Sequence, residues 1–363
     1  TCVISNAVEV GVNAGSRGEF TVQGGQFTIR DQRPVANNHF RVATNPGATG
    51  EVTLAGGTFT YLGETCAMGR SGYGRMTVTG GTNVFNGNVL IGTLAGGVGD
   101  MTVLGGSNTF SSVAAIARLQ VGGVGRGTLL SLGGTNSTVA ISVANDSGSS
   151  GVMTVSNGLW TVAEHMWVGN AGNGALTICG GEMRFLSGGP VLSIGRYGVA
   201  TGEVTVAGGL VDMGSNGSVW VGRADQTKNA GRLVLAGTGV LRTKQIFEHI
   251  PGPTSASQIL FDGGTLKASA SGTLVYSIDD VRLTTNGMVI DSAGFNVSVA
   301  TVLQDAAGQA GGITKKGAGT LTLAADRNAT GPVSVLGGTL VVSNAVSVLA
   351  GTSRIDGALT LTA

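Results

Sequence analysis

Apolar and polar residues alternate along short segments of the chain, and the same segment recurs many times. Copies include GEFTVQGG (18–25), GEVTLAGG (50–57), GRMTVTGG (74–81), GDMTVLGG (99–106) and GEVTVAGG (202–209). A period of two places successive side chains on opposite faces of a β-strand. The pattern therefore predicts strands whose apolar residues face a core, with a ladder of threonines on the outside.

The copies follow one another at intervals of 23 to 32 residues, with a period near 26. Each is preceded by a second strand-like piece ending in glycine, such as VEVG (8–11) and WVG (167–169), and Ala43 and Ala144 replace this glycine in two copies. The fifth copy, GTLLSLGG (127–134), departs from the pattern, with Leu130 in the threonine position and Ser131 in an inward position.

This period, with about three short strands per copy and no helical pattern, predicts an all-β fold. We expect a right-handed single-stranded parallel β-helix, a β-solenoid of about 12 coils of roughly 23–32 residues. One coil cannot bury its apolar face, whereas a stack of coils builds a continuous core. Paired glycines are expected to form the turns because they adopt positive φ without strain: Gly24, Gly25, Gly56, Gly57, Gly80, Gly81, Gly105, Gly106, Gly208 and Gly209.

Composition narrows the class of partner. The chain has 65 glycines in 363 residues, 42% hydrophobic residues, 11% charged residues and a formal charge of +1. Such a chain is too apolar for a disordered tail, and its charge gives no general attraction for nucleic acid. No apolar run reaches the length of a membrane span, so no membrane insertion is expected. The cysteines Cys2, Cys66 and Cys179 are odd in number and far apart, which predicts free thiols, with an intermolecular disulfide at Cys2 as the alternative.

The pattern loosens after residue 243, which divides the chain into regular repeats (1–243) and a second region (244–363) that continues the same solenoid. The second region contains KKGAGTLTL, with Lys315, Gly317, Gly319, Thr320 and Leu321 at its centre. Over roughly residues 258–345 it resembles the autotransporter-associated β-strand repeat, also called the passenger-associated transport repeat. The resemblance implies a β-solenoid in a bacterial surface or secreted protein.

Catalytic chemistry finds little support in the pattern. Carboxylates are scattered over different copies and the three histidines are isolated, so we predict no enzyme, no metal and no cofactor. Arg70, Arg196 and Arg223 each follow a strand-like piece and are candidates for contacts with a partner or a glycan carboxylate. The tryptophans and several tyrosines are candidates for sugar stacking or, alternatively, for core packing.

Both ends of the chain lie in mid-pattern without a polar cap, and open strand edges are templates for pairing. We therefore predict an extracellular or cell-surface structural solenoid, a fibre subunit whose partner is another copy joined head to tail. Two alternatives remain open: a surface adhesin or glycan-binding stalk, and a polysaccharide-active enzyme.

Overall fold

The computed structural model confirms the expected fold class, because the described residues form an all-β parallel solenoid of about twelve turns without any helix. The structure describes residues 1–30, 39–111, 118–223, 229–251, 256–343 and 353–362. Contacts divide the chain into two units. The first contains Thr1–Leu176, Gly181–Met183 and Val199–Thr201, and the second contains Thr177–Gly180, Arg184–Gly198 and Gly202–Ala363.

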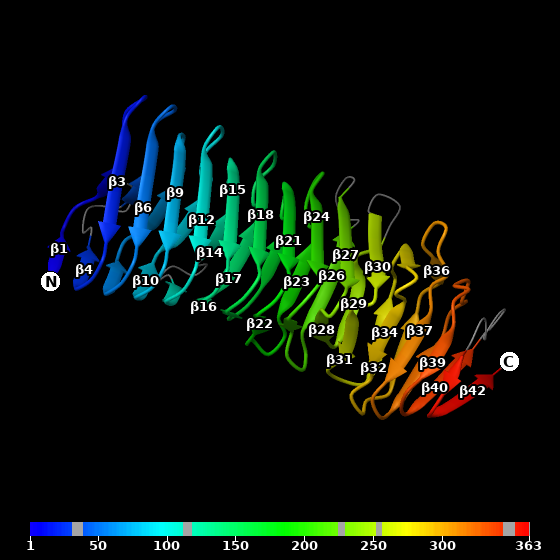
Figure 1. Cartoon of the computed structure of the whole chain (residues 1–363). Helices are drawn as coiled ribbons and strands as arrows, with labels where there is room; N and C mark the ends of the chain where they lie inside the picture. Colours follow the sequence, from blue (N-terminus) through cyan, green and yellow to red (C-terminus); the bar gives the residue numbers. More distant parts are fainter. Residues whose placement is uncertain (31–38, 112–117, 224–228, 252–255, 344–352, 363) are drawn as a thin grey trace. The chain divides into compact units, whose positions relative to one another are not determined.

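The strands of the first unit belong to three parallel sheets, called A, B and C, and each coil adds one strand to each sheet. Sheet A contains β1 (Cys2–Ile4), β4 (Gln26–Ile29), β7 (Thr58–Tyr61), β10 (Thr82–Asn86), β13 (Ser107–Ser111), β16 (Thr135–Thr138) and β19 (Leu159–Val162). Sheet B contains β2 (Val8–Val10), β5 (His39–Val42), β8 (Thr65–Met68), β11 (Asn88–Ile91), β14 (Arg118–Val121), β17 (Ala140–Val143) and β20 (Met166–Val168). Sheet C contains β3 (Arg17–Val22), β6 (Thr49–Leu54), β9 (Tyr73–Val78), β12 (Val98–Val103), β15 (Arg126–Ser131) and β18 (Ser150–Val155), which run side by side in Figure 1.

The second unit repeats this arrangement. Its strands in sheet A are β25 (Leu210–Asp212), β28 (Val240–Thr243), β31 (Thr265–Ala268), β34 (Met288–Asp291), β37 (Ile313–Lys316), β39 (Val333–Val335) and β41 (Arg354–Ile355). Those in sheet B are β23 (Val191–Ile194), β26 (Ser218–Arg223), β29 (Gln245–His249), β32 (Gly272–Tyr276), β35 (Val297–Ala300), β38 (Thr320–Leu323), β40 (Thr339–Ser343) and β42 (Ala358–Thr362). Those in sheet C are β27 (Ala230–Ala236), β30 (Ala256–Asp262), β33 (Asp280–Leu283) and β36 (Leu303–Asp305). Strands β21 (Asn173–Ile178), β22 (Glu182–Phe185) and β24 (Thr201–Val206) carry residues of both units.

The repeats aligned from the sequence are also aligned in the sheets. In sheet C of the first unit, the middle residue of each repeat pairs with its counterpart in the next coil: Thr21, Thr53, Thr77, Thr102, Leu130 and Thr154. The apolar residues on either side of this row are buried, apart from the half-buried Phe20, and the threonines face outward. A slip by one residue would exchange these two faces.

Two polar features of the first unit's core explain departures from the simple repeat. Asn83, Asn108 and Asn136 are buried in consecutive coils, and the amide of each of the first two donates a 2.8 Å hydrogen bond to the next asparagine. Ser131, the irregular residue of the fifth copy, accepts a 2.9 Å hydrogen bond from the indole N–H of the buried Trp160. A serine therefore replaces an apolar residue where the core contains a donor that must be satisfied.

Within the second unit the stack continues past residue 244, since β29 pairs with both β26 and β32. The final coils are shorter than the predicted 23 to 32 residues: Ile313 pairs with Val333, and Thr339 pairs with Ala358. These coils place described strands only in sheets A and B, because the described strands of sheet C end with β36. Loss of the third strand accounts for the shorter repeat.

The paired glycines have two different roles in the turn between sheets C and A. The second glycine of each pair has positive φ, between 67° and 84°: Gly25, Gly57, Gly81, Gly106 and Gly209. The first glycine of each pair does not have positive φ; these residues are Gly24, Gly56, Gly80, Gly105 and Gly208. At Gly56 an added Cβ would lie 2.8 Å from the carbonyl oxygen of Gln23 in the preceding coil. The first glycine of a pair therefore leaves room for the main chain of the preceding coil. Gly24 has no such neighbour because it lies in the first coil.

Close approach between coils predicts unequal effects of adding one methyl group. Gly69 has φ +61° and its added Cβ would lie 1.9 Å from the Val98 carbonyl oxygen, whereas Gly96 has φ +79° with open space around it. Gly69→Ala should lower the free energy of unfolding by about 2–5 kcal/mol, combining left-handed strain with overpacking. Gly96→Ala should cost about 1–2 kcal/mol from strain alone.

Gly24→Ala is the matched control, because Gly24 has neither positive φ nor an atom within 4 Å of its added Cβ. It should change stability by less than about 0.5 kcal/mol. The three variants are compared by urea denaturation followed by circular dichroism. Equal losses for Gly69→Ala and Gly96→Ala would show that contact between coils does not limit this turn.

Candidate functional site

Two of the three predicted arginines meet on one aromatic ring in the second unit. Arg196 follows β23 and Arg223 ends β26, and their guanidinium carbons lie 4.4 Å and 5.1 Å from the centre of the Tyr197 ring. The buried Asn229 holds their backbones together, since its side-chain amide donates to the carbonyl oxygens of both arginines. Arg70 lies separately, on the turn after β8 in the first unit.

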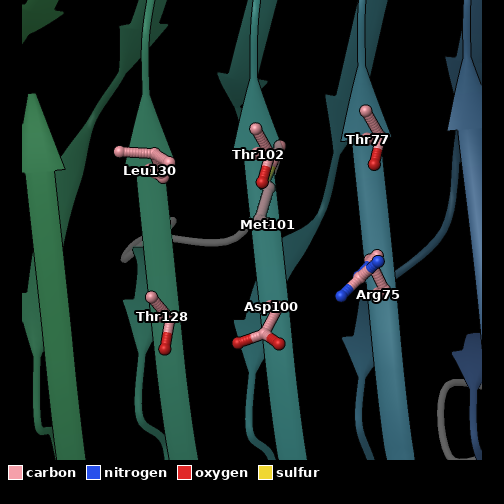
Figure 2. Close-up of a pocket in the computed structure, with 7 residues that line it drawn as sticks. All are labelled: Arg75, Thr77, Asp100, Met101, Thr102, Thr128 and Leu130. Carbon is pink, nitrogen blue, oxygen red and sulfur yellow. The ribbon is translucent and has the colours of Figure 1, made fainter. Parts of the chain in front are cut away.

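A shallow hollow of about 400 Å³ lies on the outer face of sheet C in the first unit. Figure 2 shows its lining side chains in two rows across β9, β12 and β15, with Thr77, Thr102 and Leu130 in one row and Arg75, Asp100 and Thr128 in the other; Met101 completes the lining. The hollow is a product of register, because each row consists of paired residues from consecutive coils.

The polar groups of this hollow already bond to one another. The Tyr73 hydroxyl donates to Asp100 Oδ2 at 2.8 Å and accepts from Arg75 Nη2 at 3.0 Å. Partial burial, followed by the bond to Asp100, raises the pKa of Tyr73. Glycoside hydrolysis requires two carboxyl groups flanking the bond, whereas the lining contains one. The hollow therefore lacks the pair of carboxylates that glycoside hydrolysis commonly uses, although it combines one carboxylate, Asp100, with the guanidinium group of Arg75.

Other candidate chemistry is sparse in the described part of the chain. The described residues contain no group of three side chains suited to hold a metal ion, and no helix that could cross a membrane. All three cysteines are free, with Cys66 buried and Cys2 and Cys179 exposed. Burial raises the pKa of the Cys66 thiol. Intermolecular pairing through Cys2 stays a prediction.

The lysine of the KKGAGTLTL segment is a buried structural group. Lys315 has no exposed surface, and its Nζ donates to the carbonyl oxygens of Lys316 at 2.8 Å, Gly317 at 2.7 Å and Gly337 at 3.0 Å. Burial lowers its pKa, and the nearby Asp291 opposes this effect. Because Gly337 belongs to the following coil, one ammonium group joins the turns of two successive coils.

The remaining residues of the segment shape the same turn. Gly317 and Gly319 have φ of +76° and +85°, and an added Cβ would lie 2.2 Å from Asp291 Oδ1 at Gly317 and 2.3 Å from the Phe295 carbonyl oxygen at Gly319. The Thr320 N–H donates to the Asn296 side chain at 3.0 Å, and Leu321 is fully buried. The motif thus combines a buried cation, two glycine positions and the start of the next core strand.

Asp305 forms a second polar connection, between the coil of Lys315 and the preceding coil. Its carboxylate accepts from the Thr330 hydroxyl at 2.6 Å and from the Gly311 N–H at 2.5 Å. Partial burial alone would raise the pKa of Asp305. The bonds from Thr330 and Gly311, together with the nearby Arg327 guanidinium, outweigh this effect and lower the pKa below its usual value.

A comparison with known protein families finds a match in the segment that contains Lys315. Residues 313–342 match the family model of the passenger-associated transport repeat. The match confirms the resemblance seen in the sequence, over a shorter stretch than 258–345. It begins with β37 and ends within β40, so it spans the two coils that Lys315 joins. No curated protein and no solved structure matches the chain.

Sequence reasoning missed two sets of residues. The buried asparagine ladder had a signal, because Asn83, Asn108 and Asn136 each stand two residues after a glycine pair. Phe247 and Tyr276 lie in the loosened region after residue 243, where the repeat no longer indicates which residues share a face. The structure places both on the outer face of sheet B, with Phe247 next to Trp220 and Tyr276 next to Phe247.

The buried ammonium group predicts a large effect from one substitution. Lys315→Met keeps the apolar stem but removes the donor to three carbonyl groups, and it should lower the free energy of unfolding by about 1–3 kcal/mol. Lys316→Met, which changes the exposed neighbouring lysine, is the matched control and should have an effect below about 0.5 kcal/mol. Denaturant unfolding, with hydrogen exchange of the amides in β40, measures both variants. Equal effects would contradict the joining role.

The lowered pKa of Asp305 predicts acid sensitivity. A carboxyl group with a lower pKa in the folded state stabilises the fold above its unfolded pKa, and this contribution is lost as the pH falls through the folded value. Asp305→Asn should therefore reduce the difference in melting temperature between pH 7 and pH 3. Asp326→Asn, at an exposed carboxylate, serves as the control. An unchanged pH dependence in Asp305→Asn would contradict the assignment.

Proposed function

We propose that this chain is the passenger solenoid of an autotransporter-type surface protein and acts as a structural element without catalytic activity. The observation that carries this proposal is the match to the passenger-associated transport repeat on coils that Lys315 joins. The match supports export to the cell surface or beyond. The continuous pairing of coils supports a structural role, because the repeated residues of the sequence form the stack of coils.

The finer part of the proposal is assembly of copies end to end into a surface fibre. Parallel pairing between coils uses main-chain groups and tolerates different outward side chains, as the register of Glu51 with Arg75 shows. Strand β1 pairs with β4, and its Val3 is 55% exposed. A strand edge with unpaired main-chain groups is a template for another strand, and a head-to-tail contact between copies that does not close produces a filament.

Immunogold electron microscopy of intact native cells tests both parts separately. Antibodies against the chain should label the outside of the cell, and the label should follow filaments. Label confined to the cell interior would overturn the surface assignment. Surface label without filaments, together with a single monomeric species of the purified chain in light scattering, would overturn only the end-to-end assembly.

A pair of variants tests the edge directly. Val3→Lys places a charge on strand β1 and should abolish filaments of the purified chain, since charged edge residues block strand addition. Val152→Lys is the matched control, because Val152 is 42% exposed on the outer face of β18, away from this edge. Filaments that persist in Val3→Lys would place the contact elsewhere.

A further inference from the structure

An aromatic stripe runs across the outer face of sheet B in the second unit. Trp220, Phe247 and Tyr276 are register partners on β26, β29 and β32. The ring centres of Trp220 and Phe247 are 6.2 Å apart with the ring planes at 60°, and the rings of Phe247 and Tyr276 are stacked at 5.0 Å. All three are partly exposed, whereas their strand neighbours Val219 and Val221 are fully buried, so the rings face outward.

The guanidinium group of Arg223 borders one end of this stripe, next to His249. His249 stacks on Trp220 at 3.8 Å and pairs in register with Arg223. A register shift between Trp220 and Arg223, with Gly222 at φ +76°, interrupts the regular pairing there. Such irregularities redirect side chains, and Arg223 lies over the Tyr197 ring, which Arg196 also contacts.

The surroundings favour an extended, negatively charged ligand. Glu248, which stands between Phe247 and His249 in the sequence, faces the core. It is 2% exposed and accepts a hydrogen bond from Ser257. At the other end of the stripe, Tyr276 pairs with the small exposed Ala300, which leaves the surface open beyond its ring. Three strands extend the stripe over about 10 Å, given the strand spacing.

We propose that this surface, formed by Trp220, Phe247, Tyr276, His249, Arg196 and Arg223, binds an acidic polysaccharide built from uronic acid units. Flat rings offer apolar area to the C–H faces of sugars while their hydroxyl groups remain in water. Guanidinium groups bind carboxylates through directed, charge-assisted hydrogen bonds. The formal charge of +1 for the whole chain disfavours nucleic acid, whose binding depends on neutralising many phosphates.

This inference goes beyond the proposed structural role and does not depend on fibre assembly. Binding is measured on the purified full chain, so its failure says nothing about surface location, and mislocation of the native protein says nothing about binding. A stripe that only stabilises the stack would change melting temperature when altered but would bind no glycan.

Isothermal titration calorimetry and affinity electrophoresis with polygalacturonate test the proposal, with the methyl-esterified polymer and single-stranded DNA as comparisons. The chain should bind polygalacturonate more tightly than either. Trp220→Ala should weaken binding about tenfold or more through the lost ring contact, comparable to other aromatic stacking sites. Arg223→Gln should weaken binding to polygalacturonate while leaving the weaker binding to the ester unchanged.

Arg232→Gln is the matched control, because Arg232 lies on the outer face of sheet C in the same unit and forms an ion pair with Glu203. It should bind like the unaltered chain, and circular dichroism verifies that each variant is folded. Since Arg223→Gln leaves the rings in place, it keeps the test decisive where Trp220→Ala does not fold. Absence of binding to polygalacturonate, equal binding to the ester or the DNA, or unchanged binding in Arg223→Gln would overturn the proposal.

Discussion

Residue-for-residue pairing between parallel coils is the constraint on which the other features depend. Each strand forms main-chain hydrogen bonds to the equivalent strand of the next coil, so a residue type repeated in the sequence becomes a column in space. The columns include glycine: Gly50, Gly74 and Gly99 are paired, and an added Cβ at Gly50 would lie 2.4 Å from the Val10 carbonyl oxygen. Pairing thus determines which positions are apolar, which are outward and which have no room for a side chain.

Polar groups inside such a stack must find partners in neighbouring coils. The asparagine ladder does so by repetition, because Asn83 and Asn108 each donate to the next asparagine and also to a turn carbonyl, as Asn108 does to Gly105. Lys315 does so by reaching the carbonyls of two successive turns, where each of its three bonds is made to main chain. Both devices join coils through groups that would be costly to leave unsatisfied. These hydrogen bonds therefore strengthen pairing between specific coils. Apolar columns alone do not distinguish one coil from another.

The regular part of the fold could be predicted from the sequence because equivalent positions of the sequence repeat are the paired positions of the sheets. Threonines at equivalent positions of the sequence repeat are paired in the sheets, and Ala43 and Ala144 adopt the positive φ, 57° and 56°, of the glycines that they replace. Prediction was weaker where a contact joins coils of different pattern. The carbonyl partner of Lys315 at Gly337, and the convergence of Arg196 and Arg223 on Tyr197, depend on coil lengths that the loosened repeat does not show.

The proposed structural and binding roles use opposite faces of the same strands. Alternation assigns every second residue of β26 and β29 to the core, where Val219 and Ile246 are fully buried. The outward positions are free of that packing requirement, and in most coils of the first unit they hold threonine or charged residues on sheet C. Large rings at Trp220 and Phe247 depart from this rule on sheet B, and outward aromatic residues that gather on one face are typical of a contact surface. A solenoid can therefore gain a binding site without altering its core, because only the outward half of each strand has to change.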